Sequence, residues 1–206
     1  MTTTFTLLRH GQVSGAPALY GHTNISLSEH GYTLMCAAIE RINESLTIDR
    51  VVTSPLTRCA KVAKLISVKY AVPLHIVNDL AEMHFGDWDG VAFDQLENRW
   101  AQLEAFWQSP DAVQPPNGEQ LDGFARRVIT AWEKLVTDTS KNINSTHNLV
   151  ICHGGTIRII IAHILQIDWR NAALFTQLQI NYSSYTRVEL KGPGKTQAII
   201  KCIGVC

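Results

Sequence analysis

Histidine side chains follow two predicted strands of this sequence, one of them beside an arginine. Residues 4–8 are apolar or β-branched, which predicts a short buried strand that delivers Arg9, His10 and Gly11 at its end. His153 follows a second apolar run in the same way. Ligand sites in open α/β sheets lie beyond the carboxyl ends of the strands, where a glycine permits close approach to a ligand. An imidazole can act as a nucleophile and a guanidinium can bind phosphate, so this pattern indicates a phosphate site.

Two further residues extend this candidate site. Ser54 and Pro55 predict the N-cap and first turn of a helix with Arg58 near its start, where free N–H groups attract anions. Glu82 lies in a predicted loop over 79–90, after a third strand, and can serve as a general acid and base. Each residue alone also fits an ordinary structural role, but their joint position at strand ends favours the phosphate site.

The composition is that of a globular protein without charge bias. The 206 residues are 46% hydrophobic and 17% charged, with 18 basic and 18 acidic residues. This balance leaves no overall field for nucleic acid or an anionic membrane, so neither partner is expected. There is no visible signal peptide and no apolar run of membrane-spanning length. Five dispersed cysteines indicate a reducing, cytoplasmic location, with Cys36, Cys59 and Cys152 buried and Cys202 and Cys206 as free thiols.

Alternating strands and helices predict an α/β fold with a mostly parallel sheet covered on both faces. Strands are expected at 4–8, 50–53, 72–77 and 148–152, with two or three closing strands after residue 179 around a turn at 191–194. Helices are expected over 29–43, 55–68 and 121–139, and after 153–156 to about residue 165. The first is capped by Ser28, and Leu34 and Leu65 are expected to face inward. The aromatic-rich helical segment and the polar, proline-rich segment over 91–120 predict a helical lid inserted over the strand ends, within one domain spanning 1–206.

Three segments, in this order and spacing, resemble the histidine phosphatase superfamily. They are Arg9-His10-Gly11, Thr53-Ser54-Pro55-Leu56-Thr57-Arg58 and His153-Gly154-Gly155. The resemblance covers nearly the whole chain and implies a three-layer α/β/α sandwich of the phosphoglycerate mutase type. Within the superfamily, residues 19–24, 27–31, 82–88 and 116–119 look most like α-ribazole phosphatases, which act in assembly of the cobalamin nucleotide loop.

The resemblance implies a phosphomonoesterase that needs neither a metal nor another cofactor. His10 is expected to attack phosphorus and form a phosphohistidine, kept neutral by Arg9 and Arg58 and aimed by a backbone carbonyl. Arg9, Arg58 and His153 are expected to bind the phosphate oxygens, with His153 also in the catalytic set. Glu82, beside the anionic phosphate, is expected to protonate the leaving alkoxide and then to activate water.

Some positions depart from the family pattern. Gln12 stands where many members carry Glu, Ala16 replaces an asparagine of the mutases, and Gln120 replaces a frequent Ser. Gln12, Asn24 and His84 are candidates for substrate binding, and whether Asn24 replaces the missing asparagine in phosphate binding is left open. The chain is also shorter than a typical mutase, which favours a phosphatase.

The favoured substrate is a small-molecule phosphomonoester, α-ribazole 5′-phosphate. Aromatic residues in or near the predicted lid could stack on dimethylbenzimidazole or form the core of the insertion: Trp88, Trp100, Phe106 and Trp107. Few basic residues lie near the lid, chiefly Arg99, which favours a monoester over a heavily phosphorylated substrate. Alternatives are a broad-specificity phosphatase, a cofactor-dependent phosphoglycerate mutase, a metal site, and a non-catalytic binder of phosphorylated ligands. The tail strands and Cys206 leave room for a homodimer.

Overall fold

The computed structural model describes residues 2–140, 145–191 and 197–206. One mixed sheet of six strands forms the centre, in the order β3-β2-β4-β1-β5-β6. The strands are β1 (Thr3–Arg9), β2 (Arg50–Thr53), β3 (Leu74–Ile76), β4 (Thr146–Cys152), β5 (Tyr185–Lys191) and β6 (Gln197–Val205). The first four strands are parallel, whereas β5 runs antiparallel to both β1 and β6. The mostly parallel sheet is therefore as predicted, with two closing strands; residues 192–194 of the expected turn lie outside the described residues.

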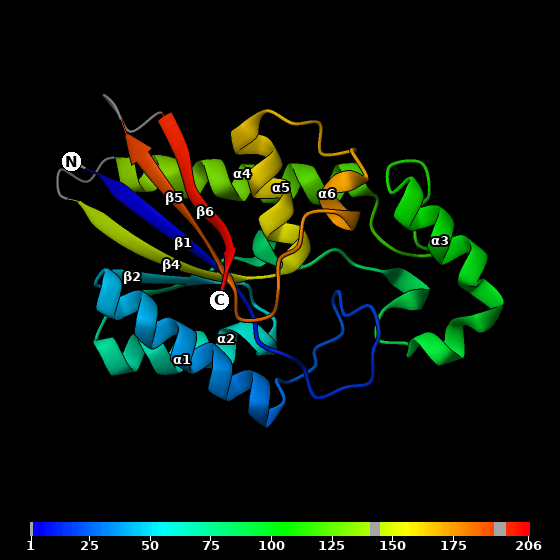
Figure 1. The fold of residues 1–206 in the computed structure, drawn as a ribbon, viewed down its shortest axis with the longest axis horizontal. Helices are drawn as coiled ribbons and strands as arrows, with labels where there is room; N and C mark the ends of the chain where they lie inside the picture. The colour runs from blue at the N-terminus through cyan, green and yellow to red at the C-terminus, as the bar shows by residue number, and fades with distance from the viewer. Residues whose placement is uncertain (1, 141–144, 192–196) are drawn as a thin grey trace.

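Helices cover both faces of the sheet, as expected for a three-layer sandwich. One face carries α1 (Glu29–Ser45) and α2 (Thr57–Tyr70), and the other carries α4 (Leu121–Ser140) and α5 (Gly154–Leu165) (Figure 1). Short helices fill the connections: η1 (Asn78–Leu80), η2 (Gly86–Trp88), η3 (Phe93–Arg99), α3 (Trp100–Gln108) and α6 (Ala173–Thr176). Among the described residues, no helix has the length and apolar character needed to cross a bilayer.

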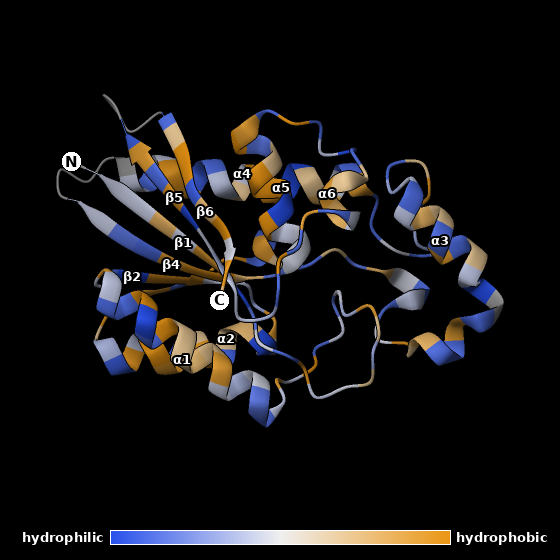
Figure 2. Ribbon diagram, in the orientation of Figure 1, coloured by the Kyte–Doolittle hydropathy of each residue, from blue (hydrophilic) through white to orange (hydrophobic). Residues whose placement is uncertain are grey.

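The alternation of side chains along the strands builds two separate cores. Phe5 and Leu7 of β1 pack in the core beneath α4 and α5, whereas Leu8 packs in the core beneath α1 and α2. Figure 2 shows the apolar residues concentrated on the strands and on the helices that cover them. Packing on both faces fixes the position of each central strand. The residues that follow β1 and β4, among them His10 and His153, are therefore positioned by the two cores.

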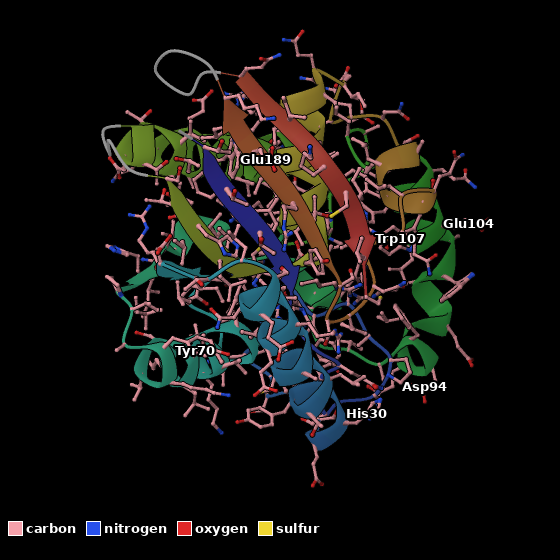
Figure 3. The ribbon with its side chains drawn as sticks, turned by 60° about the vertical axis from the view of Figure 1, so that its left-hand side comes forward. His30, Tyr70, Asp94, Glu104, Trp107 and Glu189 are labelled. Atoms are coloured by element: carbon pink, nitrogen blue, oxygen red, sulfur yellow. The ribbon has the colours of Figure 1, made fainter. Side chains whose placement is uncertain are left out.

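Residues 93–108, which form η3 and α3, lie beyond the end of the sheet toward which β1 and β4 run. Figures 1 and 3 agree on this placement, and Asp94, Glu104 and Trp107 mark the segment in Figure 3. The short helices of this segment bury Leu96, Leu103 and Phe106 against the larger core. This corresponds to the helical insertion expected over the strand ends.

Several local predictions were wrong. Ser54 does not cap α2, which begins at Thr57 after Leu56 as its N-cap. Leu34 and Leu65 are 48% and 50% exposed, because each lies one position away from the buried stripe of its helix. Cys36 is half-buried, whereas Cys59 and Cys152 are buried as expected. Ser28 does cap α1, since its hydroxyl accepts a hydrogen bond from the N–H of Gly31 at 3.0 Å.

Candidate active site

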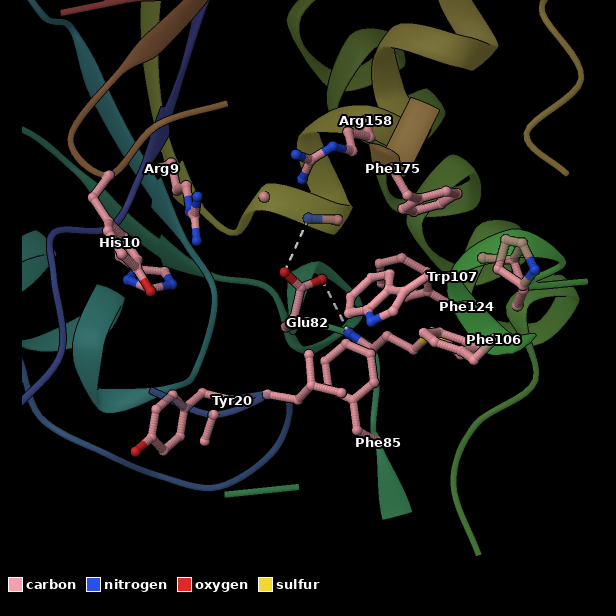
Figure 4. A pocket seen from close by; sticks show the side chains of 18 residues that line it. Arg9, His10, Tyr20, Glu82, Phe85, Phe106, Trp107, Phe124, Arg158 and Phe175 are labelled. Atoms are coloured by element: carbon pink, nitrogen blue, oxygen red, sulfur yellow. Dashed lines mark hydrogen bonds between the residues drawn. The ribbon is translucent and has the colours of Figure 1, made fainter. Parts of the chain in front are cut away.

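A cavity of about 220 Å³ opens where β1 and α5 meet the helical insertion. Arg9, His10 and Glu82 line it at one end (Figure 4). Its aromatic lining consists of Tyr20, Phe85, Phe106, Trp107, Phe124, Phe175 and Tyr182. The cavity therefore has a polar end, with a guanidinium, an imidazole and a carboxylate, and a mainly apolar end.

His10 is buried, and the backbone fixes its ring. Nδ1 lies 2.8 Å from the carbonyl oxygen of Gly11, which can only accept, so Nδ1 carries the proton and Nε2 keeps its lone pair. Burial, followed by the charges of Arg58 and Arg9, holds the pKa of His10 well below its usual value. The imidazole is thus neutral at physiological pH, and the expected backbone carbonyl is the one from the next residue.

Arg58 and His153 lie behind the cavity lining rather than in it. Arg58 Nε donates to Nδ1 of His153 at 3.3 Å, and Nε2 of His153 lies 2.7 Å from the hydroxyl of Ser54. The His153 ring is 5.1 Å from the ring of His10, edge to face. Burial first, and then Arg58, His10 and Arg9, hold the pKa of His153 well below its usual value. Ser54, expected as a helix cap, instead binds this histidine.

Arg58 also holds the loop that follows β1. Its Nη1 donates to the carbonyl oxygen of Thr23, and its Nη2 donates to those of Tyr20 and Gly21. Asp89 fastens the same loop, since its carboxylate accepts from the N–H groups of residues 21, 22, 23 and 85. Burial alone would raise the pKa of Asp89, but the hydrogen bonds from Thr23, His22 and Phe85 outweigh it and lower that pKa. The loop is therefore tied down from two sides.

Glu82 is held between the start of α5 and α4. One carboxylate oxygen accepts from the N–H of Gly155 at 2.9 Å, and the other accepts from the N–H of Met83 at 3.1 Å (Figure 4). Arg127 of α4 donates to the carbonyl oxygens of Asp79, Ala81 and Glu82 and pairs with Glu119. The turn at 116–119 thus supplies the carboxylate that aligns Arg127. A side chain at Gly155 would collide with Glu82, because its Cβ would lie 2.3 Å from Oε1.

Arg9 extends from the end of β1 into the polar end of the cavity. Its Nη1 donates to the carbonyl oxygen of Ile180 at 2.5 Å, and its guanidinium carbon lies 4.0 Å from the centre of the Tyr182 ring. Its Nε is buried without a hydrogen-bond partner among the described residues. Arg9 therefore has donor capacity that the surrounding described chain does not use.

The three candidates for substrate binding lie outside the cavity lining. Gln12 is exposed, and its carbonyl oxygen accepts from Ser28. The side-chain oxygen of Asn24 accepts from the N–H of Thr57 at 2.8 Å, so Asn24 caps α2. His84 accepts from Gly86 through Nδ1 and packs edge to face on His22. Asn24 therefore uses its side-chain oxygen inside the protein in this structure, and its role in place of the missing asparagine stays a prediction.

Gly11 makes its close approach to the protein rather than to a ligand. A Cβ on Gly11 would lie 2.1 Å from the carbonyl oxygen of Gly31, and a Cβ on Gly31 would lie 2.1 Å from that of Gln12. These two glycines let the turn after β1 pack directly on α1. The close approach expected of Gly11 is thus made to the first turn of α1.

Two cavity residues had no distinct signal in the sequence. Arg158 of α5 and Tyr182, between α6 and β5, line the cavity beside Arg9. The position of Arg158, four residues after Gly154 on the same helix face, was the only available hint. Of the lid aromatics, Phe106 and Trp107 line the cavity, whereas Trp88 is fully buried and Trp100 is 55% exposed. Among the described residues, no group of three His, Cys, Asp or Glu side chains is placed to hold a metal ion.

Comparison with known proteins places this arrangement in a family. The family model of the histidine phosphatase superfamily (branch 1) matches residues 5–201. The chain belongs to the histidine phosphatase superfamily. This superfamily member is 32% identical over 188 residues to an adenosylcobalamin/alpha-ribazole phosphatase of Salmonella typhimurium, with 89% of each chain covered.

The chain is also similar to a second curated protein and to a solved structure. A bifunctional protein of Mycobacterium tuberculosis is 28% identical over 190 residues, which are 91% of this chain and 50% of that protein. The chain thus spans about half the length of this mycobacterial relative. The solved structure of a mycobacterial glucosyl-3-phosphoglycerate phosphatase superimposes with a TM-score of 0.85 at 21% identity and full coverage of both chains. At that identity the likeness concerns the fold alone.

Proposed function

We propose that this protein hydrolyses phosphomonoesters through a phosphohistidine formed on His10. The observation that carries the proposal is a neutral, buried His10 with a free Nε2, on a cavity that also holds Arg9 and Glu82. A neutral imidazole is the form that can attack phosphorus. The proposal accounts for why the carbonyl of Gly11 binds the other ring nitrogen.

In the first step, the Nε2 lone pair attacks phosphorus and the bond to the ester oxygen breaks. Arg9 binds the non-bridging oxygens through its unused donors. Arg58 adds positive potential from behind the cavity lining, and the neutral ring of His153 can donate a hydrogen bond. Glu82, in its protonated form, gives its proton to the leaving oxygen. In the second step, Glu82 takes a proton from water, the oxygen attacks phosphorus, the P–N bond breaks and phosphate leaves.

We infer further that the substrate is α-ribazole 5′-phosphate. Support comes from the Salmonella relative, whose name includes alpha-ribazole phosphatase, and from the aromatic end of the cavity, where Phe85, Phe106 and Trp107 offer faces for a flat base. A flat heterocycle can stack on such side chains while its phosphate reaches Arg9. A broad-specificity phosphatase is the alternative that a substrate comparison must separate.

Rapid alkaline quenching during turnover, followed by mass spectrometry, tests the mechanism. We expect a phosphoryl group on His10 and no adduct in His10→Ala, with His163→Gln, a half-buried histidine of α5 away from the cavity, as the matched control. An adduct on another residue, or none in the wild type, would contradict the mechanism. For the substrate, kcat/KM for α-ribazole 5′-phosphate should exceed that for ribose 5-phosphate and 3-phosphoglycerate. Equal values on all three would favour the broad-specificity alternative.

A further inference from the structure

The guanidinium of Arg158 has a donor-bearing end that the described part of the chain leaves unused. Nε and Nη2 of Arg158 both donate to the carbonyl oxygen of Leu178, at 3.1 and 2.9 Å. This pair of bonds fixes the plane of the guanidinium. Nη1 makes no hydrogen bond to any described residue, although Arg158 lines the cavity. Two N–H groups of a fixed cation are therefore available to a ligand.

Arg158 and Arg9 both lie beside Gly154. A Cβ on Gly154 would lie 2.9 Å from Nη1 of Arg158 and 3.4 Å from Nε of Arg9. The absence of a side chain there leaves room for both guanidinium groups on the same side of the cavity, above Glu82 (Figure 4). Burial and Arg9 both lower the pKa of Arg158, while Glu82 opposes them. Two like charges kept together with one carboxylate favour a ligand that brings further oxygen acceptors.

The position of Arg158 within the cavity determines which part of a ligand it meets. Arg9 and His10 occupy the end proposed for the phosphoryl group, and Phe175 and Trp107 belong to the aromatic end. Figure 4 shows Arg158 between Arg9 and Phe175. A group bound at Nη1 therefore lies between the phosphoryl group and the apolar portion of the ligand.

We propose that Arg158 is a specificity-determining residue whose Nη1 hydrogen-bonds an oxygen of the leaving group, next to the phosphoester. This inference rests on the phosphatase function proposed above. The substrate class is a phosphomonoester of a sugar or other polyol, in which a ring or hydroxyl oxygen lies within a few bonds of the ester. A plain aryl ester has no such acceptor and gains nothing from Arg158.

The test compares ribose 5-phosphate with phenyl phosphate in wild type, Arg158→Gln and Arg158→Lys. A hydrogen bond from a charged donor corresponds to a loss of about 10-fold to 100-fold when removed. In Arg158→Gln we expect kcat/KM for ribose 5-phosphate to fall at least 10-fold further than kcat/KM for phenyl phosphate, mostly through KM. Arg158→Lys keeps a cation, so its kcat/KM for ribose 5-phosphate should lie between the values for wild type and Arg158→Gln. Arg187→Gln, in β5 and away from the cavity, is the matched control.

Equal losses on both substrates, or no loss on either, would overturn the proposal for Arg158. Thermal unfolding of each variant shows whether the fold is kept; if Arg158→Gln is unfolded, the same comparison is made with Arg158→Lys, and an unchanged substrate ratio there overturns the proposal. A wild-type protein that hydrolyses none of ribose 5-phosphate, phenyl phosphate and α-ribazole 5′-phosphate refutes the phosphatase function itself. An active wild type with an unchanged ratio in the variants refutes only the role of Arg158.

Discussion

Arg58 Nε donates to Nδ1 of His153, and this bond decides where the imidazole carries its proton. Arg58 can only donate, so Nδ1 is unprotonated and the proton of the neutral ring is on Nε2. That proton points to the hydroxyl of Ser54, 2.7 Å away. A phosphate oxygen can receive it only by replacing Ser54. The proposed phosphate contact of His153 therefore competes with a bond inside the protein.

Ser54→Ala should destabilise the protein by about 1–3 kcal/mol, because it leaves the buried Nε2–H of His153 with only the weak acceptor Sγ of Cys59, 3.7 Å away. Urea unfolding measures this change. Ser14→Ala removes a hydroxyl from an exposed loop and should change stability by less than about 0.5 kcal/mol. Equal effects of the two substitutions would show that the Ser54 bond contributes nothing.

Asn24→Ala should cost about 1 kcal/mol of stability through the lost cap on α2, with kcat and KM nearly unchanged. Asn24→Asp restores the accepting oxygen and should recover most of the loss. Denaturant unfolding and steady-state kinetics on the same samples separate the two roles. A rise in KM without a change in stability would return Asn24 to the substrate site.

Gly11→Ala should be strongly destabilising, because its Cβ would lie 2.1 Å from the backbone of Gly31. Relieving this clash requires a backbone shift, which costs stability. We expect a loss of about 3 kcal/mol or more by urea unfolding. Gly123→Ala, within α4, is the control, since the nearest atom to its Cβ belongs to Glu119 at 4.0 Å. This substitution should stabilise the protein by about 0.5–1 kcal/mol. A similar sign for both would contradict the packing described.

Stability should fall as the pH drops below about 6.5, the ordinary histidine value. Burial is the first cause that lowers the pKa values of His10, His147 and His153, so the unfolded chain binds protons in a range where the folded chain does not. Urea midpoints at pH 7.5, 6.5 and 5.5 should decrease in that order. His147→Gln should make the decrease smaller, whereas His30→Gln, on the exposed side of α1, serves as control. A midpoint that rises toward pH 5.5 would contradict this sign.

The common location of Arg9, His10 and Glu82 could be predicted from the sequence, because strand ends and turn glycines are visible as local patterns, and all three line one cavity. It could not show that Arg58 is enclosed by backbone carbonyls of the loop at 20–23, since those acceptors carry no residue identity. The same limit hid the partner of Asn24. The exposure of Leu34 and Leu65 has another cause: apolar spacing fixes the centre of a buried helix face but not its edges.

The carboxylate of Asp89 binds the N–H groups of residues 21–23, which lie 66 to 68 positions earlier in the chain, and the N–H of Phe85, four positions earlier. The rim of the cavity near Tyr20 and Phe85 is thereby rigid before any molecule arrives. The conformational entropy of these loops is lost during folding rather than at association, so each contact with an incoming molecule contributes more fully to affinity. Encounter rates should accordingly depend on diffusion into an open mouth instead of on the closing of a flexible flap.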